Sequence, residues 1–172
     1  HLEQVLRERY GVKLLAIYAY PAQTVFCKEP LRSLADLAGR RVRTSGVSQS
    51  DLVDALGGRP VQIPFAEVVN AMKQGNLDCA ITGTLSGNAI GLHDVTRFLH
   101  TQHISWGLSL FGANLAAWNA LGPEVQQILQ RELLTLEASI HANAVEQTDD
   151  GVACNTGRAE CRGGRAGRMV AG

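Results

Sequence analysis

The sequence predicts an α/β fold whose sheet is mainly parallel. Three short strand-like runs, at 41–44, 61–64 and 79–82, follow one another at regular intervals, with helical patterns between them. A glycine follows each of the intervening helical stretches, so each helix leads directly into the next strand. Strands that alternate with helices over connections this short are typical of a parallel sheet with right-handed crossovers.

The segment before these strands predicts one helix and two strands. Residues 1–10 carry apolar side chains at helical spacing and are followed by Gly11, which is typical of a helix C-terminus. Residues 12–20 are rich in aliphatic and aromatic side chains and are bounded by Gly11 and Pro21, so they predict a buried strand. A second short strand is expected at 24–27.

The central segment repeats the order of helix, glycine and strand. Ser33 and Asp36 have the spacing of a capping box, with Asp in place of the usual Glu or Gln, at the start of a helical turn that ends at Gly39. A helix at 48–56 precedes the second of the three strands, and a helix at 66–74 precedes the third.

The elements expected after the third strand are less regular. They are a short helix at 86–95, a strand at 97–100, a long strand at 104–112, a short helix capped by Asn114, and a long helix from Pro123 to about Thr148. The segment after Gly151 is rich in Gly and Arg. This composition would predict disorder, but the segment contains two cysteines.

Composition and charge exclude several classes of partner. The chain has 172 residues, a formal net charge of zero and a pI of about 7.1, so binding to nucleic acid or to an anionic membrane surface has no electrostatic support. No apolar run approaches the roughly 20 residues that a membrane span needs. The chain begins at His1 without an initiator Met or an apolar leader, and we expect a fragment or a processed chain.

The strand order places one arginine where open α/β sheets bind ligands. Parallel strands joined by helices all end at the same edge, where the following helices present free backbone N–H groups. Arg43 and Thr44 end the first run, Pro64 and Phe65 follow the second, and Thr82 ends the third. A guanidinium can bind a carboxylate through two parallel hydrogen bonds, which Lys cannot copy. We therefore expect a carboxylate ligand at this edge.

No group of residues typical of an enzyme or a metal site occurs in the sequence. His93, His100 and His103 follow no compact ligand spacing, and the segment 83–87 lacks the Lys that a phosphate-binding loop requires. We expect no catalysis, no cofactor and no metal.

The four cysteines raise two separate questions. Cys154 and Cys161 enclose a short segment, which favours a disulfide in an oxidising compartment; a metal site there would lack a C-x-x-C motif and a nearby His. Cys27 and Cys79 can form a second disulfide if their strands are adjacent, or remain as buried free thiols.

Five segments in a particular order resemble a known family. They are 34–43 (LADLAGRRVR), 55–58 (ALGG), 63–68 (IPFAEV), 74–78 (QGNLD) and 118–128 (WNALGPEVQQI). Together they resemble the DctP-type solute-binding proteins of TRAP transporters, over nearly the whole chain. In that family two α/β lobes, joined by crossing strands and a long helix, close on an organic acid that is passed to a membrane permease.

The resemblance implies a fold of the periplasmic-binding-protein type II kind. The chain would contain the second lobe, and most of the first lobe would be missing. It assigns 1–26 to the end of the first lobe and a hinge-crossing strand, and 27–103 to the second lobe. A returning strand and a hinge helix follow at 104–150, and 151–172 form a tail. Ligand binding by this chain alone is therefore in question.

The resemblance also implies roles for individual residues. The carboxylate-clamping arginine of the family corresponds to Arg43, and an aromatic residue that lies against the ligand corresponds to Phe65, whose alternative is core packing. Thr82 stands where the family often has an Asn that contacts the ligand. Gln23 stands where sialic acid binders have a second arginine. These two departures favour a ligand with one carboxylate over a sugar acid.

Two aromatic residues are further candidates for the pocket wall. Trp106 lies on the expected returning strand and can stack on an apolar ligand body or pack in the core. Tyr20 lies on the expected crossing strand and can face the cleft or the core.

The leading hypothesis is a periplasmic solute-binding subunit of a TRAP transporter that captures a small carboxylate and delivers it to membrane permease subunits. The alternatives are a ligand-sensing extracellular domain of the same fold, a non-functional remnant, and an enzyme on a two-lobed scaffold.

Overall fold

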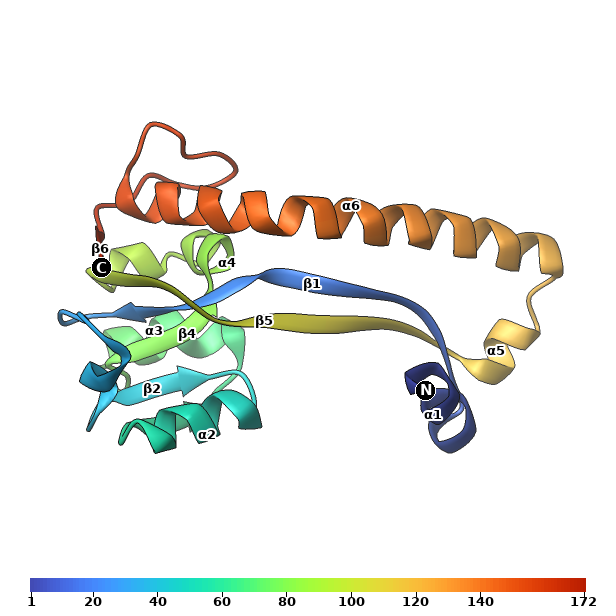
Figure 1. The fold of residues 1–172 in the computed structure, drawn as a ribbon, viewed down its shortest axis with the longest axis horizontal. Coiled ribbons are helices and arrows are strands. Elements are labelled where there is room, and N and C mark those ends of the chain that lie inside the picture. Colours follow the sequence, from blue (N-terminus) through green and yellow to red (C-terminus); the bar gives the residue numbers. More distant parts are fainter. The chain divides into compact units, whose positions relative to one another are not determined.

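The computed structural model describes residues 1–172, which form two compact units. The smaller unit comprises His1–Tyr20 and Gly107–Ala144, and the larger unit comprises Pro21–Trp106 and Val145–Gly172. Three elements contribute to both units (Figure 1): β1 (Val12–Cys27), β5 (Phe98–Asn114) and α6 (Pro123–Thr156).

The strands form one six-stranded sheet with the order β3-β2-β4-β1-β5-β6. The remaining strands are β2 (Arg41–Thr44), β3 (Arg59–Gln62), β4 (Cys79–Gly83) and β6 (Val170–Ala171). β2 is parallel to both β3 and β4, and β5 is parallel to β6, whereas β1 is antiparallel to β4. The prediction of an α/β fold with a mainly parallel sheet is confirmed.

Helices cover both faces of the sheet in the larger unit. They are α2 (Val47–Ala55), α3 (Val68–Lys73) and α4 (Thr84–Ala89), with the short 3₁₀ turns η1 (Leu34–Leu37), η2 (Phe65–Glu67) and η3 (Leu92–Asp94). Because side chains alternate along a strand, Val25 and Ile81 pack against Val53 of α2 on one face. Phe26 packs with Met72 of α3 on the other face.

A disulfide belongs to the core cluster that contains Val25 and Ile81. Cys27 of β1 and Cys79 of β4 are directly opposite each other in the antiparallel register, with their Cα atoms 4.1 Å apart, and they form a disulfide. The sequence left this pairing open, because it depends on which strands are neighbours.

The smaller unit contains α1 (Leu2–Tyr10) and α5 (Leu115–Asn119) beside its parts of β1, β5 and α6. The predicted end of α1 is confirmed, because Gly11 takes the left-handed conformation (φ 62°) that closes the helix. The predicted cap of α5 is confirmed as well: the Asn114 side chain accepts a hydrogen bond from the Ala117 N–H at 3.0 Å.

Several predicted boundaries are wrong. The two strands expected at 12–20 and 24–27 are one continuous strand, β1. The two strands expected at 97–100 and 104–112 are likewise one strand, β5. Pro21 does not end β1, because the N–H of Ala22 is satisfied by the Thr148 hydroxyl at 2.9 Å. β3 ends before Pro64, which instead precedes η2. The helix expected at 86–95 is divided between α4 and η3.

The long helix α6 continues beyond the predicted end near Thr148 to Thr156. Gly151 lies inside it, where a Cβ atom would collide with the backbone nitrogen of Leu85 and the hydroxyl of Thr84. The glycine therefore allows close approach of α4 and does not end the helix. None of the helices is both long enough and apolar enough to cross a bilayer.

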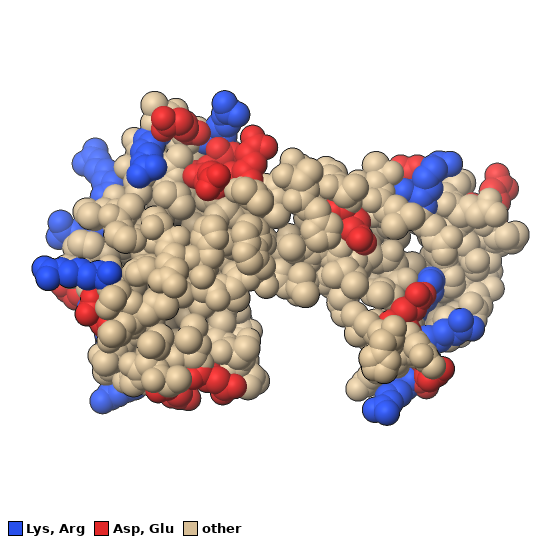
Figure 2. Space-filling model, in the orientation of Figure 1, with Lys and Arg blue, Asp and Glu red and all other residues tan.

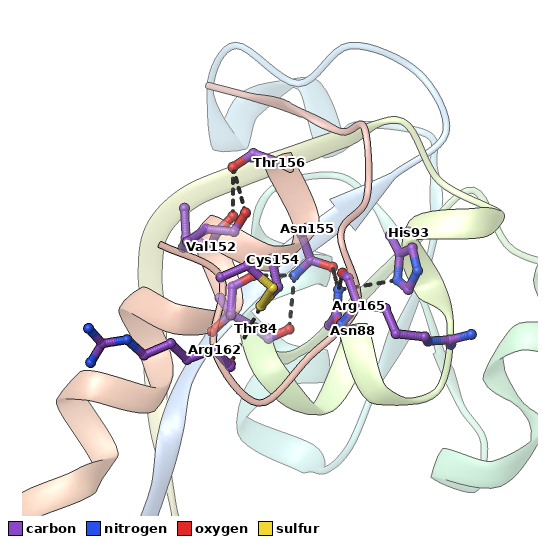
Figure 3. The surroundings of a disulfide bond; sticks show 12 residues. Thr84, Asn88, His93, Val152, Cys154, Asn155, Thr156, Arg162 and Arg165 are labelled. Carbon is purple, nitrogen blue, oxygen red and sulfur yellow. Dashed lines mark hydrogen bonds between the residues drawn. A yellow bond between two sulfur atoms is a disulfide. The ribbon is translucent and has the colours of Figure 1, made fainter. Parts of the chain in front are cut away.

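The C-terminal tail is folded onto the larger unit. A disulfide joins Cys154 of α6 to Cys161, and Figure 3 shows the Asn88 side chain directed at the tail beside it. The Asn88 carboxamide accepts from the Arg165 N–H at 2.7 Å and donates to the Arg165 carbonyl at 2.8 Å and to Asn155 Oδ1 at 3.1 Å. The tail then ends in β6 at the sheet edge.

Charged side chains of both signs occur in each unit, with no extended single-sign surface on the face shown in Figure 2. This distribution agrees with the formal net charge of zero.

Candidate ligand-binding site

The side chain of Arg43 is held in position by backbone carbonyl groups. Its Nη1 donates to the Ile81 carbonyl oxygen at 3.0 Å, and its Nε donates to the Ile63 carbonyl oxygen at 3.3 Å. The guanidinium therefore joins β4 to the segment that follows β3, at the C-terminal edge of the parallel strands. Nη2 has no protein partner and Nη1 keeps a second N–H, so two adjacent donors remain for a carboxylate.

No acidic side chain neutralises this guanidinium. Arg43 is 5% exposed, burial lowers its pKa, and none of the ion pairs in the structure includes it. In contrast, Arg41 on the same strand binds Asp78 through two side-chain hydrogen bonds of 2.6 and 2.9 Å. A buried cation without a counter-ion is unfavourable, so Arg43 would gain from an anionic ligand.

Phe65 lies next to Arg43. Its ring centroid is 5.9 Å from Arg43 Cζ, which is within the range of a cation–π contact. The ring is 38% exposed and belongs to neither core cluster, so it is available to a ligand bound at the guanidinium.

Thr82 and Gln23 lie on neighbouring strands but on different faces of the sheet. Arg43 is in register with Ala80, and side chains alternate, so Thr82 shares the face of Arg43. Gln23 is opposite Gly83 and therefore belongs to the other face, where its Nε2 donates to the Pro21 carbonyl at 3.3 Å. The structure thus places Thr82, but not Gln23, on the strand face that carries Arg43.

The two aromatic candidates have local partners of their own. Trp106, 40% exposed in the larger unit, contacts His103 edge-to-face at 5.7 Å between ring centroids. Tyr20 belongs to the smaller unit, where its ring packs against Tyr18 at 5.3 Å and its hydroxyl is 3.3 Å from the Tyr18 hydroxyl. Within the larger unit, no ring contact joins Trp106 to Arg43.

Thr24 is a further polar residue at this edge, and sequence reasoning missed it. It is opposite Thr82 in the register of β1 and β4, and therefore lies on the same face as Thr82 and Arg43. It is fully buried, and its hydroxyl has no hydrogen-bond partner. The pattern at 24–27 predicts a strand with alternating side chains. It does not predict which strand pairs with it, and so it does not show that Thr24 lies beside Thr82.

A separate hollow of about 400 Å³ lies between β3 and α3 and does not include Arg43. Its lining contains one acidic residue, Glu67, and no basic residue. This hollow therefore lacks the positive charge that a carboxylate ligand requires.

The histidines do not form a reactive group. His100 is buried, and desolvation lowers its pKa, while His103 contacts Trp106. His93 Nδ1 lies 3.3 Å from the Asn88 amide nitrogen. No cluster of three or more His, Cys, Asp or Glu side chains has the geometry of a metal site.

A comparison with protein families matches residues 1–156 to the DctP model, described as bacterial extracellular solute-binding protein, family 7. The chain belongs to this DctP family. The match ends at Thr156, the last residue of α6, and therefore includes Cys154 but not Cys161.

Two curated DctP-like relatives are periplasmic binding proteins. The ectoine-binding protein TeaA of Halomonas elongata is 25% identical over 126 residues, covering 73% of this chain and 37% of TeaA. The 2,3-diketo-L-gulonate-binding protein YiaO of Escherichia coli is 27% identical over 124 residues, covering 71% of this chain and 38% of YiaO. The chain thus spans less than two fifths of these relatives.

Solved structures share the fold. A Bordetella pertussis extracytoplasmic solute receptor binding pyroglutamic acid has a TM-score of 0.85 at 23% identity, covering 98% of this chain and 56% of that one. A TRAP periplasmic solute-binding protein from Haemophilus influenzae with bound L-gulonate has a TM-score of 0.82 at 20% identity, covering 99% and 54%. The DctP fold therefore accounts for nearly the whole chain.

Proposed function

We propose that this chain is the ligand-clamping part of a periplasmic solute-binding protein of a TRAP transporter, and that it captures a small carboxylate. The observation that carries the proposal is the Arg43 guanidinium. It is buried, is held by two backbone carbonyls, has no acidic partner, and lies at the strand edge of a DctP-family sheet. A ligand carboxylate supplies the missing negative charge.

The two disulfides support a periplasmic location. All four cysteines are paired, as Cys27–Cys79 and Cys154–Cys161, and such bonds persist in oxidising compartments. The periplasmic relatives TeaA and YiaO support the same location, and membership of the DctP family supports TRAP permease subunits as the partner.

The proposed ligand carries one carboxylate and is released without chemical change. Arg43 is the arginine of β2 that has no protein counter-ion, because Arg41, at the beginning of the strand, is already paired with Asp78. The neighbouring side chains, Phe65 and Thr82, are an aromatic ring and a hydroxyl, and they form no nucleophile and base pair. We therefore propose retention of the ligand without turnover.

Isothermal titration calorimetry against a panel of small organic acids tests the proposal. The panel includes pyroglutamate and L-gulonate, because relatives of the same fold were solved with these molecules. At least one monocarboxylate should bind, and Arg43→Ala should weaken its affinity by roughly 30-fold or more, since a charged hydrogen-bonded pair contributes about 2 kcal/mol or more. The acid should be recovered unchanged after incubation.

Arg59→Ala is the matched control, because Arg59 is an exposed arginine on the neighbouring strand β3, in register with Arg41. It should leave affinity unchanged. If the wild-type chain binds none of the acids, or if both arginine variants behave alike, the proposed function of this chain is wrong.

A further inference from the structure

Residues 157–172 follow α6 and form a strap that includes β6 at the edge of the sheet. β5 lies between β1 and β6, so the strap covers an edge of β5 that would otherwise be open. The N–H groups of Val170 and Gly172 donate to carbonyl groups of β5 at 2.8 and 3.0 Å, and the Gly172 carbonyl accepts from the Thr101 N–H at 2.9 Å. An open strand edge is a template for pairing with another chain, and covering the edge prevents that pairing.

Two buried residues anchor the strap to the larger unit. Most strap residues are exposed, but Gly167 and Met169 are buried, and the Met169 side chain belongs to the core cluster that contains Leu99. The N–H groups of these two residues donate to the carbonyl groups of Cys154 and Asn155 at 2.7 and 2.9 Å. The strap therefore binds through main-chain hydrogen bonds and one apolar side chain, which is how an added strand is recognised at a sheet edge.

The fit of the strap depends on the glycine at position 167. A Cβ atom on Gly167 would lie 2.4 Å from the carbonyl oxygen of Asn155, although the backbone of Gly167 is not in the left-handed region. Asn155 is held in place, because its side chain donates to the carbonyl groups of Thr84 and Gly151 at 2.9 and 2.8 Å (Figure 3). A side chain at position 167 therefore displaces the strap and leaves the wall of its binding site unchanged.

A short covalent connection holds the strap near this site. The disulfide ties Cys161 to Cys154 of α6, and residues 162–166 link this anchor to Gly167. A segment on a short flexible tether has an effective concentration of about millimolar at its own site. The chain's own strap therefore excludes a free segment that is present at micromolar concentration.

We infer that the edge of β5 and the adjoining core position of Met169 form a strand-binding site, which this chain's own strap fills and which accepts the same segment from a second copy of the chain. The chemistry of the site identifies this partner: an extended segment with glycine at the position of Gly167 and an apolar side chain at the position of Met169. A copy whose strap is displaced has both an empty site and a free strand, and these are the conditions for exchange of an element between copies.

The test measures the binding of a fluorescently labelled peptide of residues 165–172 (RAGRMVAG) to the full chain by fluorescence anisotropy. Gly167→Ala should displace the chain's own strap and bind the peptide. Wild type should bind the peptide at least about tenfold more weakly, because its tethered strap occupies the site. Ala166→Ser is the matched control, since Ala166 is the exposed neighbour of Gly167, and it should behave like wild type. A peptide that carries Met169→Asp should not bind.

Circular dichroism shows whether each variant is folded, and Met169→Ala provides a second way to weaken the strap without changing the wall of the site. The inference is overturned if the folded variants do not bind the peptide, if wild type binds it as tightly as Gly167→Ala, or if the Met169→Asp peptide binds equally well. It is also overturned if neither variant folds, because the strap would then be an inseparable part of the core. None of these outcomes bears on the proposed function, which the acid panel tests separately.

Discussion

The two disulfides should contribute unequally to stability, and the structure gives the expected difference. Cys27–Cys79 closes a loop with a sequence separation of 52, whereas Cys154–Cys161 closes one of 7. In the loop-entropy model, closing the longer loop stabilises the folded state by about 4 kcal/mol and closing the shorter one by about 2.5 kcal/mol. Both pairs lie in the larger unit, so one unfolding transition reports on both.

The perturbation is a pair of double variants, Cys27→Ala/Cys79→Ala and Cys154→Ala/Cys161→Ala. Urea unfolding followed by circular dichroism gives the free energy of unfolding of each. The first variant should lose about 4 kcal/mol or more, because its sulfur atoms also pack in the core. The second should lose about 2.5 kcal/mol.

Mass spectrometry with and without reductant confirms that each variant keeps its other disulfide. Losses that agree within about 0.5 kcal/mol, or a larger loss for the tail pair, would refute the argument from loop length. A larger loss for the tail pair would mean that Cys154–Cys161 acts through the tail contacts it positions, rather than through chain entropy.

Three further predictions concern the tail, α6 and a surface ion pair. Asn88→Ala should cost about 2–4 kcal/mol in urea unfolding, because it leaves the Arg165 backbone groups without their buried partner; the exposed Asn70→Ala is its control, and an equal small loss in both would contradict the prediction. Gly151→Ala should lower the thermal midpoint, although alanine favours helices, because its Cβ meets the α4 backbone; a raised midpoint would contradict the packing argument. The hydrogen bond from Arg41 lowers the pKa of Asp78, so its stabilising contribution is complete above the unfolded pKa and is lost as pH falls through the folded pKa. The stability advantage of wild type over Asp78→Asn should therefore be complete above about pH 5 and should shrink as the pH falls below about 4, and an advantage that did not shrink between about pH 5 and pH 3 would contradict this assignment.

Local signals in the sequence were sufficient for the elements that depend on local chemistry. The glycine that ends α1, the capping box of η1 and the asparagine cap of α5 all appear as predicted. Each depends on side chains within a few residues of the element, so spacing alone indicates them.

The errors occur where a distant residue determines the local structure. β1 continues through Pro21 because Thr148, far along the chain, accepts the hydrogen bond of the next N–H group. α6 continues through Gly151 because α4 packs against it. In both cases the local sequence favours an end, and a contact between distant segments overrides it.

The same limit applies to the candidate site. The sequence indicates Arg43 by its place at a strand end and by family resemblance, but it cannot reveal Thr24, because the register of β1 on β4 determines what Thr24 faces. Gln23 is adjacent in sequence to Thr24 but lies on the other face of the sheet, and this too depends on the strand register.

Arg41 and Arg43 show why the position along one strand determines the role of an arginine. Both belong to β2 and point to the same face, two residues apart. Asp78 directly precedes β4, so its carboxylate is beside the beginning of β2 and neutralises Arg41. At the other end of β2 the neighbouring strands offer Arg43 only backbone carbonyls. The protein therefore neutralises the first cation itself and leaves the second without a counter-ion, which is the arrangement that the proposed carboxylate clamp requires.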